Sequence, residues 1–434
     1  MDIYVVQPGD TVYSIADKYG VTAIRLIQDN GIDNPIHLVP GQSIVITYPE
    51  KVHIVQEGDT LSSIADFYGV TLIQLLRNNS FLSGREYIYP GEILVISYKT
   101  NGKVSTNGYT YAHIAKDTLI KSLPYLTYIS VFNYQITEDF AVTSLGNDSE
   151  VIKLSIDYGV VPLLMISSIS PKGIPNLELI FTIMTNKELL DRLINSYLNI
   201  LQSTGYYGIN LLLSGLNENN QKVYIDFLTT VSDALKSRGY LLIITINPDF
   251  KLIDDNLQFV KIDYSSFTPL VDNIIFLKDV WGTYEGPPAP VSSINYIRRL
   301  IEYVISLTPP EKITFGNPLI GYDWIIPYTL KNYYAYSLTL NSAITLANDV
   351  GAIIQFDEIS QTPFFQYSTN YPGGSTNHII WFIDARSINA LLELIKEYNL
   401  AGSGIWNIMI YYQPLWTLIN SQFEINKLIP DNIM

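Results

Sequence analysis

The first hundred residues contain two copies of one pattern, and this repeat limits the fold of the chain more than any other feature. Residues 5–11 (VVQPGDT) recur at 54–60 (IVQEGDT), and residues 14–22 (SIADKYGVT) recur at 63–71 (SIADFYGVT). A Pro-Gly pair precedes an apolar triplet in both copies, at an offset of 50 residues instead of the 49 seen for the earlier landmarks. Two adjacent copies of one short unit indicate two small modules of the same fold.

Each copy predicts the element order β-α-α-β. A short strand ends at a Gly-Asp turn, and we expect the side chains of Asp10 and Asp59 to accept backbone N–H groups at the start of the next helix. Apolar residues at helical spacing follow, a glycine closes the first helix, and Pro-Gly turns the chain into the last strand. The predicted modules span residues 1–48 and 51–98.

This repeat closely resembles the LysM module, which binds glycans containing N-acetylglucosamine, such as peptidoglycan and chitin. The resemblance implies a shallow groove between the Gly-Asp-Thr loop and the loop before the last strand. The residues that it assigns to glycan binding are Gly9, Asp10, Thr11, Asn30 and Ile36 in the first copy, and Gly58, Asp59, Thr60, Asn79 and Ile88 in the second. A role of Asp10 and Asp59 in helix capping alone is the alternative, and the two roles are compatible.

The rest of the chain alternates short apolar strands with amphipathic helices. Residues 99–107 are polar and predict a linker. The predicted strands are Tyr109–His113, Tyr125–Phe132, Val160–Ile166, Gly208–Leu213, Leu241–Ile246, Asn273–Leu277, Lys312–Asn317 and Ser403–Ile408. Strands and helices in this alternation predict an α/β fold, a (β/α)8 TIM-type barrel over residues 108–434. Residues from about 322 to 384 are predicted to form a small α+β insertion.

Several runs in this region resemble glycoside hydrolase family 18, and in particular its LysM-bearing spore cortex-lytic N-acetylglucosaminidases. These runs include LTYI at 126–129, GYYGIN at 205–210, GNPLIGYDW at 316–324, QFDE at 355–358 and DARS at 384–387. Active members carry the signature D-G-x-[DN]-x-D-x-E on the fourth strand. Its Glu protonates the leaving oxygen, and the Asp before it orients the substrate acetamide, in a substrate-assisted variant of the two-carboxylate scheme.

In this sequence the four positions at which the signature has Asp, Asn or Glu fall on Tyr207, Asn210, Leu212 and Ser214. Of these residues, the family signature allows only the Asn. Leu212 takes the place of the orienting Asp. Ser214 takes the place of the proton donor, and a hydroxyl group does not act as a general acid near neutral pH. Two further pocket positions, at which the family has Tyr, are Asp279 and Ile320. We therefore predict that these positions are degenerate, that the chain has no catalytic residues, and that it is not an enzyme but a pseudo-glycosidase.

Aromatic residues offer a second role for the barrel. Trp281, Trp324 and Trp406 follow or end predicted strands, where they could stack on a sugar without cleaving it. Packing in the core or the insertion is the alternative for these tryptophans. A residual N-acetylglucosaminidase activity, with an acid such as Asp279 in place of the usual one, is the alternative to an inactive barrel.

Composition excludes several other classes of function. The net charge is −15 without a Lys/Arg cluster, so nucleic acid is not an expected partner. The chain has no cysteine, and its four histidines are dispersed, so we predict no metal site and no cofactor. No run of eighteen uncharged apolar residues predicts a membrane span, and the N-terminus lacks the features of a signal peptide. We therefore expect synthesis in the cytoplasm.

Our leading prediction is an inactive glycosidase-like protein that binds peptidoglycan of the spore cortex through its LysM modules. It would act as a structural or assembly protein of the spore envelope, deposited on the forming spore or in a cytoplasmic inclusion. Only 15% of the residues are charged and 33 are Tyr, a composition that also suits contacts with copies of the chain or with other envelope proteins. The alternatives are a self-assembling lattice, fibre or intracellular crystal, and a chitin-directed or insecticidal parasporal factor.

Overall fold

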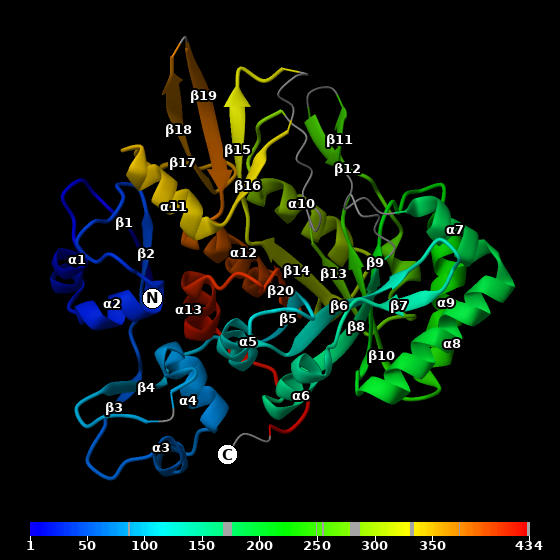
Figure 1. The fold of residues 1–434 in the computed structure, drawn as a ribbon, viewed down its shortest axis with the longest axis horizontal. Coiled ribbons are helices and arrows are strands. Elements are labelled where there is room, and N and C mark those ends of the chain that lie inside the picture. Colours follow the sequence, from blue (N-terminus) through cyan, green and yellow to red (C-terminus); the bar gives the residue numbers. More distant parts are fainter. Residues whose placement is uncertain are drawn as a thin grey trace.

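The structure is a computed structural model. It describes residues 1–85, 87–167, 176–248, 250–253, 256–277, 287–329, 334–372 and 374–431. Two small modules lie beside a barrel that carries an α+β insertion (Figure 1). Among the described residues, no helix combines the length and the apolar character needed to cross a membrane.

Each N-terminal module has the predicted β-α-α-β order. The first consists of β1 (Asp2–Val5), α1 (Val12–Tyr19), α2 (Ala23–Asn30) and β2 (Ser43–Ile46). The second consists of β3 (Lys51–Ile54), α3 (Leu61–Tyr68), α4 (Leu72–Asn78), the 3-10 turn η1 (Ser80–Leu82) and β4 (Ile93–Ser97). The two strands pair antiparallel in each module, and each module has its own small apolar core.

Threonines, not aspartates, cap the first helix of each module, which corrects our prediction for Asp10 and Asp59. The side chain of Thr11 accepts a hydrogen bond from the backbone of Ser14, and the Ser14 side chain returns one to the backbone of Thr11. Thr60 forms the same capping box in the second module. The physical reason is position, because the threonine directly precedes the helix and its hydroxyl reaches the third helical residue.

The barrel is confirmed as a TIM-type barrel of parallel strands. In the described chain it is formed by β5 (Lys103–Tyr111), β6 (Tyr128–Ile136), β8 (Val161–Ser167), β9 (Gly208–Leu213), β10 (Leu241–Ile246), β13 (Asn273–Phe276), β14 (Ile313–Pro318) and β20 (Gly402–Trp406). Each strand pairs in parallel with the next, and pairing of β5 with both β6 and β20 closes the barrel.

The predicted linker is too long. Strand β5 begins at Lys103, so residues 103–107 belong to the barrel and not to a linker. Two of the polar residues that suggested a linker, Thr106 and Asn107, are buried, and the Ser130 hydroxyl donates a hydrogen bond to Asn107 Oδ1 at 2.8 Å. A strand with this many polar residues has the amino-acid composition of a loop, which is why the sequence predicts a linker here.

Helices surround the barrel and bury their apolar faces on it. They are α5 (Lys116–Ser122), α6 (Ser149–Asp157), α7 (Leu177–Thr185), α8 (Lys187–Thr204), α9 (Gln221–Lys236), α10 (Ile294–Ile305), α12 (Ala385–Glu397) and α13 (Gln413–Gln422). Shorter pieces are the 3-10 turns η2 (Leu123–Tyr125), η3 (Tyr264–Ser266) and η4 (Pro310–Lys312), and strands β7 (Val142–Ser144), β11 (Phe250–Ile253), β12 (Asn256–Phe259) and β21 (Glu424–Ile425).

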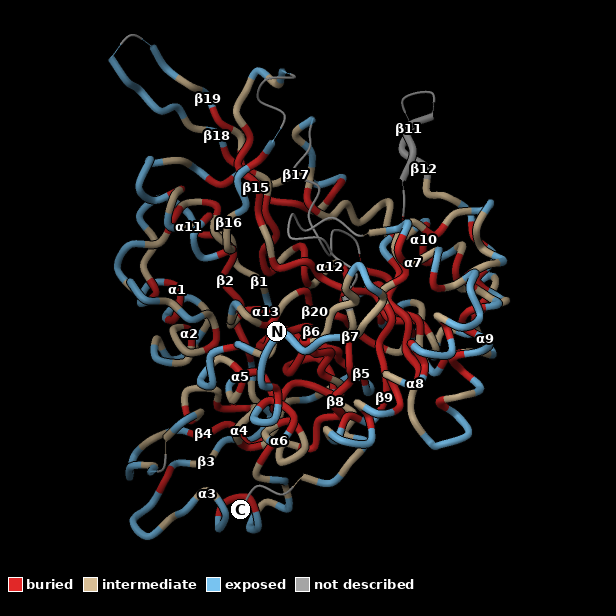
Figure 2. The backbone as a smooth tube through the Cα atoms, turned by 45° about the vertical axis from the view of Figure 1, so that its right-hand side comes forward, coloured by how far each residue is buried: buried red, intermediate tan, exposed pale blue. Residues whose placement is uncertain are grey.

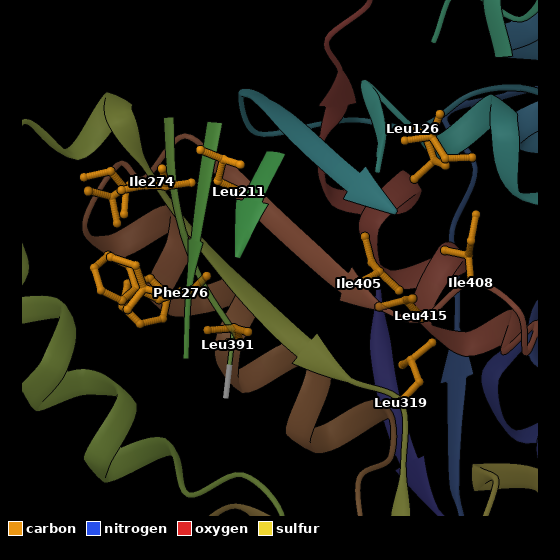
Figure 3. Packing of buried hydrophobic residues seen from close by; sticks show 14 of the residues in the cluster. Leu126, Leu211, Ile274, Phe276, Leu319, Leu391, Ile405, Ile408 and Leu415 are labelled. Atoms are coloured by element: carbon orange, nitrogen blue, oxygen red, sulfur yellow. The ribbon is translucent and has the colours of Figure 1, made fainter. Parts of the chain in front are cut away.

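The strands have two faces with separate apolar clusters. Leu211, Ile274 and Leu391 belong to the outer core between the strands and the helices (Figure 3). Leu212, the neighbour of Leu211, packs against a second cluster made of side chains from several barrel strands. This alternation follows from the two-residue period of a strand, so Asn210 and Leu212 share the inner face of β9, and Ser214 directly follows the strand.

The α+β insertion is present in the region where it was predicted. It contains β15 (Gly321–Ile326), β16 (Tyr336–Leu338), α11 (Leu340–Asp349), β17 (Gln355–Asp357), β18 (Thr362–Tyr371) and β19 (Gly374–Phe382). The strands form one antiparallel sheet in the order β16-β15-β19-β18-β17. The far end of the β18–β19 hairpin projects from the body and is exposed (Figure 2).

Helix α13 holds both modules against the barrel. Thr417 Oγ1 donates to the backbone carbonyl of Asp29 in the first module at 2.7 Å. Asn420 Nδ2 donates to Asn78 Oδ1 in the second module at 2.9 Å, and Arg77 Nε donates to Asn420 Oδ1 at 2.9 Å. These side chains are buried or half-buried, so the modules are docked on the barrel by a polar interface.

Candidate functional site

The aspartate of each Gly-Asp-Thr loop fixes the turn that precedes it. Asp59 Oδ2 accepts hydrogen bonds from Gln56 N at 2.7 Å and from His53 Nε2 at 2.8 Å. The backbone N–H of Gln56, helped by His53, lowers the pKa of the Asp59 carboxyl group. In the first module Asp10 accepts from the backbone of Gln7, and Tyr4 replaces the histidine. The aspartates therefore stabilise the conformation of the Gly-Asp-Thr loops to which they belong.

The Gly-Asp-Thr loop of the second module forms one wall of a groove of about 630 Å³. We call it the second-module groove, and define it by its lining residues Asp59, Thr60, Leu61, Ser62, Leu72, Leu76, Leu82, Ser83, Gly84, Arg85, Tyr87, Ile88, Ile120 and Tyr158. Three of the glycan-binding residues expected from the resemblance are among them: Asp59, Thr60 and Ile88. The groove therefore lies between the two loops that the resemblance indicates.

Asn79 and Asn30 have a structural task in their modules. The Asn79 amide donates to the carbonyls of Leu75 and Val95 and accepts from the backbone of Val95. Its side chain is buried, so its polar groups are already satisfied inside the module. Asn30 ties α2 to β2 in the same way, through the backbone of Val45.

The first module places its predicted residues differently. Ile36 is exposed, and the carbonyl of the preceding Pro35 accepts a hydrogen bond from Val12, so the two loops touch beside Gly9, Asp10 and Thr11. The loop after α2 also borders a separate cavity of about 280 Å³ against the insertion and the barrel. Its lining includes Asn30, Asp33, His37, Asn341, Asn348 and Tyr412.

The resemblance indicated three of the fourteen residues that line the second-module groove, so most of its lining was missed. Leu72, Leu76 and Tyr87 could have been found from the repeat, because Leu72 and Leu76 lie on the helix before the loop with the extra residue and Tyr87 lies in that loop. Ile120 and Tyr158 carry no such signal. They belong to the barrel and reach the groove only because the module docks there.

The inner face of strand β9 contributes apolar and neutral polar groups to the barrel. Leu212 packs with the cluster that contains Met165 and Leu277. Leu213, by contrast, faces the helices and does not cover the mouth. Ser214 is half-buried, and its backbone carbonyl accepts a hydrogen bond from the Tyr224 hydroxyl.

Asn210 lies at the centre of a buried chain of hydrogen bonds across the barrel. Its amide donates to Ser130 Oγ at 2.9 Å and its carbonyl accepts from Thr245 Oγ1 at 2.7 Å. The hydroxyl of Tyr109 lies 2.6 Å from Thr245 Oγ1, and burial raises the pKa of that tyrosine. The side chains in this series of hydrogen bonds are uncharged and fully buried, which suits a structural role in the barrel interior.

The remaining predicted site residues are scattered. Trp406 packs on Tyr109 and Phe132 inside the barrel, with 9% of its surface exposed. Trp324 lies on β15 in the insertion and belongs to the outer core, so the structure does not bring these two tryptophans together. Ile320 also packs against that core. Tyr207 precedes β9, at the end of the strand opposite to the mouth. Asp279 and Trp281 lie outside the described residues.

The described strands limit the chemistry of the barrel. None of the eight barrel strands contains Asp or Glu within its bounds. Within the described parts of the chain, no group of three His, Cys, Asp or Glu side chains is placed to hold a metal ion. A proton donor for hydrolysis would therefore come from a loop at the carboxyl ends of the strands, where TIM barrels place their chemistry.

Comparison with known proteins decides the family. The model of glycosyl hydrolases family 18 matches residues 172–409, and the LysM domain model matches residues 4–47 and 53–97. This chain belongs to glycosyl hydrolase family 18. It is 32% identical to a cortical fragment-lytic enzyme of Bacillus subtilis, over 98% of this chain and 99% of the relative.

Two solved structures share the whole architecture of this family 18 chain. The spore cortex-lytic enzyme SleL of Bacillus megaterium has a TM-score of 0.77 at 29% identity and covers 98% of this chain and 99% of its own. SleL of Bacillus cereus has a TM-score of 0.78 at 28% identity, with 99% of both chains covered. The predicted resemblance and fold class are thereby confirmed.

The prediction that this chain is not an enzyme is contradicted by these relatives. The relatives that match nearly the whole chain include proteins named cortical fragment-lytic enzyme and spore cortex-lytic enzyme. This chain shares their modules, barrel and insertion. That prediction rested on four positions of one strand and two further positions. Residue types at those positions do not define the activity of a barrel whose loops can supply the acid.

Proposed function

We propose that this family 18 chain is a glycan-directed protein of the spore-cortex type. Its two LysM modules bind peptidoglycan through N-acetylglucosamine, and its barrel acts on the same glycan. One observation carries the proposal: the similarity to cortical fragment-lytic enzymes runs over the whole chain, through modules, barrel and insertion together. The second-module groove supports it as a concave surface of a size suited to a sugar chain.

Charge and shape of the groove fit a neutral sugar chain. Leucine and isoleucine side chains are among its lining residues, and Asp59, Thr60 and Arg85 supply polar groups. Arg85 is already paired with Glu92, at 3.0 Å, so the groove carries little uncompensated charge. Sugars bind surfaces of this composition through apolar ring faces and a few hydrogen bonds at the rim.

Hydrolysis by this barrel requires an acid from outside strand β9. Asp279 follows β13 by three residues and is a carboxylate that the sequence places after the carboxyl end of a barrel strand. We include it in the proposal as the proton donor. General acids contribute about 10²- to 10⁴-fold to such reactions, so Asp279→Asn is expected to lower product release by that factor.

Binding is tested by sedimentation with purified cortex peptidoglycan. The variant is the double substitution Asp10→Ala/Asp59→Ala, and its matched control is Asp17→Ala/Asp66→Ala, which removes exposed aspartates from equivalent positions of the same helices. We expect the wild-type chain and the control to sediment with the glycan and the double variant to stay in the supernatant. A wild-type chain that stays in solution would refute the proposal.

The action of the barrel is tested separately, by mass spectrometry of fragments released from the same peptidoglycan. Release by the wild-type chain and its loss in Asp279→Asn are the expected results. Release that is equal in the two proteins would show that Asp279 is not the donor. No release by a chain that binds the glycan would refute the part of the proposal that concerns the barrel.

A further inference from the structure

The second-module groove is not made by the LysM module alone. Two of its lining residues, Ile120 and Tyr158, come from the barrel. Ile120 lies in α5, and Tyr158 directly follows α6. Figure 1 shows the module beside these two helices, and α4 contacts η2, which follows α5. The barrel therefore forms one side of the groove.

This side lies on the face of the barrel opposite to the mouth. Helices α5 and α6 start after the carboxyl ends of their strands and run back towards the amino-terminal ends. Tyr158 stands three residues before β8 begins at Val161. A ligand in the groove would therefore touch the back of the barrel and leave the mouth free.

The backbone at Tyr158 is held rigidly. The ammonium group of Lys427 donates to the carbonyl of Tyr158 at 3.1 Å, and also to the carbonyls of Leu123 at 3.1 Å and Leu126 at 2.7 Å. This one half-buried lysine side chain joins the segment after α6 to the segment after α5. The two residues of the barrel wall thus keep a fixed spacing without a ligand, which lowers the entropy cost of binding one.

The chemistry of the barrel wall suits a sugar with an acetamido group. An aromatic ring packs on the apolar face of a pyranose, and a branched aliphatic side chain packs on a methyl group. Tyr158 is half-buried, and burial raises the pKa of its phenol, so the ring stays neutral at physiological pH. Across the groove, Asp59 and Thr60 offer polar groups for sugar hydroxyls and amides.

We propose that the second-module groove is a composite site, in which Tyr158 and Ile120 of the barrel bind the same N-acetylglucosamine chain as the LysM loops. This inference rests on the proposed function, because it takes the glycan class from there. The composite site holds a glycan strand across the back of the barrel. It follows that a longer oligosaccharide gains affinity from the barrel wall, and that the module and the barrel move as one body on the glycan.

The first test is amide hydrogen exchange of the full chain with and without the N-acetylglucosamine hexamer. We expect slower exchange in the module loop 58–62 and also in the barrel segments 118–122 and 156–160. Slower exchange in the module loop alone would overturn the composite site and leave the proposed function intact. No change in the loops of either module would contradict the proposed function itself.

The second test uses variants and titration calorimetry with oligomers of two to six sugars. Tyr158→Ala is expected to weaken hexamer binding at this site about threefold to tenfold, because aromatic contacts contribute on that scale. Tyr158→Phe keeps the ring and is expected to bind like the wild type. Tyr336→Ala, which removes an exposed tyrosine from the insertion, is the matched control.

Ile120→Arg provides an independent probe of the same wall, since it introduces a long charged side chain from α5 and leaves the sequence of the Tyr158 segment unchanged. We expect it to weaken hexamer binding by a similar factor and to have a smaller effect on the dimer, which is too short to need the barrel. Equal hexamer affinities for Tyr158→Ala, Ile120→Arg and the wild type would overturn the inference.

Discussion

The first module docks on the insertion through a glycine, and the equivalent glycine of the second module makes no such contact and can serve as the control. Gly41 and Gly91 occupy the same position of the repeat, with φ values of 87° and 92°. A Cβ added to Gly41 would lie 1.9 Å from the carbonyl oxygen of Ile354 in the insertion, whereas a Cβ on Gly91 would meet nothing within 4 Å. Substituting both glycines with alanine therefore separates backbone strain from loss of docking.

The magnitudes follow from these contacts. Both substitutions place alanine in the left-handed region, at about 1–2 kcal/mol. Gly41→Ala also forces the segments apart, which breaks the bond from Ile354 N to Pro40 O and the bond from Arg386 to Gly41 O. At about 1 kcal/mol for each hydrogen bond, the expected loss is about 3–4 kcal/mol, against about 1–2 kcal/mol for Gly91→Ala. The change in unfolded-state entropy is the same for both and cancels.

The assay is urea denaturation followed by circular dichroism, with amide exchange at residues 352–356 as a local measure of docking. We expect Gly41→Ala to be less stable than Gly91→Ala by about 2 kcal/mol, and to expose residues 352–356 to faster exchange. Equal losses of stability, with unchanged exchange in that segment, would refute this view of how the first module is held.

Two further predictions concern the barrel interior and the second module. Asn210→Leu removes one buried hydrogen-bond partner from Ser130 and one from Thr245, which keep Asn107 and Tyr109 as their other partners. We expect a loss of about 2–4 kcal/mol in the free energy of unfolding, and a loss below about 0.5 kcal/mol would contradict the hydrogen-bond chain. The pKa of Asp59 is lowered by its hydrogen bonds. A lowered carboxyl pKa stabilises the folded loop above the usual value of about 4, and this contribution is lost as the pH falls through the lowered pKa. The affinity for the uncharged hexamer should therefore stay constant from neutral pH to about pH 5 and fall below about pH 4. Titrations across that range measure this affinity. The same pH dependence in Asp59→Asn would contradict the role of the Asp59 carboxyl group.

Much of the fold could be predicted from the sequence, because its signals are local. The module boundaries follow from a repeat of turn residues, and the barrel strands follow from apolar runs separated by helices. Strand β5 was missed in part because its buried side chains include polar ones such as Asn107, whose Oδ1 accepts a hydrogen bond from Ser130 on β6. The helix caps were assigned to Asp10 and Asp59 instead of Thr11 and Thr60, since a one-residue offset decides which oxygen reaches the helix.

The candidate site was less predictable, because it depends on contacts between distant segments. Asp59 and Thr60 were indicated by the repeat, but Tyr158 lines the same groove from about a hundred positions further along the chain. Asn79 was indicated by resemblance, yet its amide is used inside the module. The activity was misjudged for a related reason: the residues of one strand do not report what the loops of a barrel contribute.

Titration calorimetry of the full chain with the N-acetylglucosamine hexamer tests the central claim most directly. We predict saturable binding by the wild-type chain, at up to two hexamers per chain, and a loss of at least about tenfold in affinity for Asp10→Ala/Asp59→Ala, which corresponds to about 1.4 kcal/mol. The absence of saturable binding, or an affinity that is unchanged in the double variant, would contradict glycan binding by the two modules.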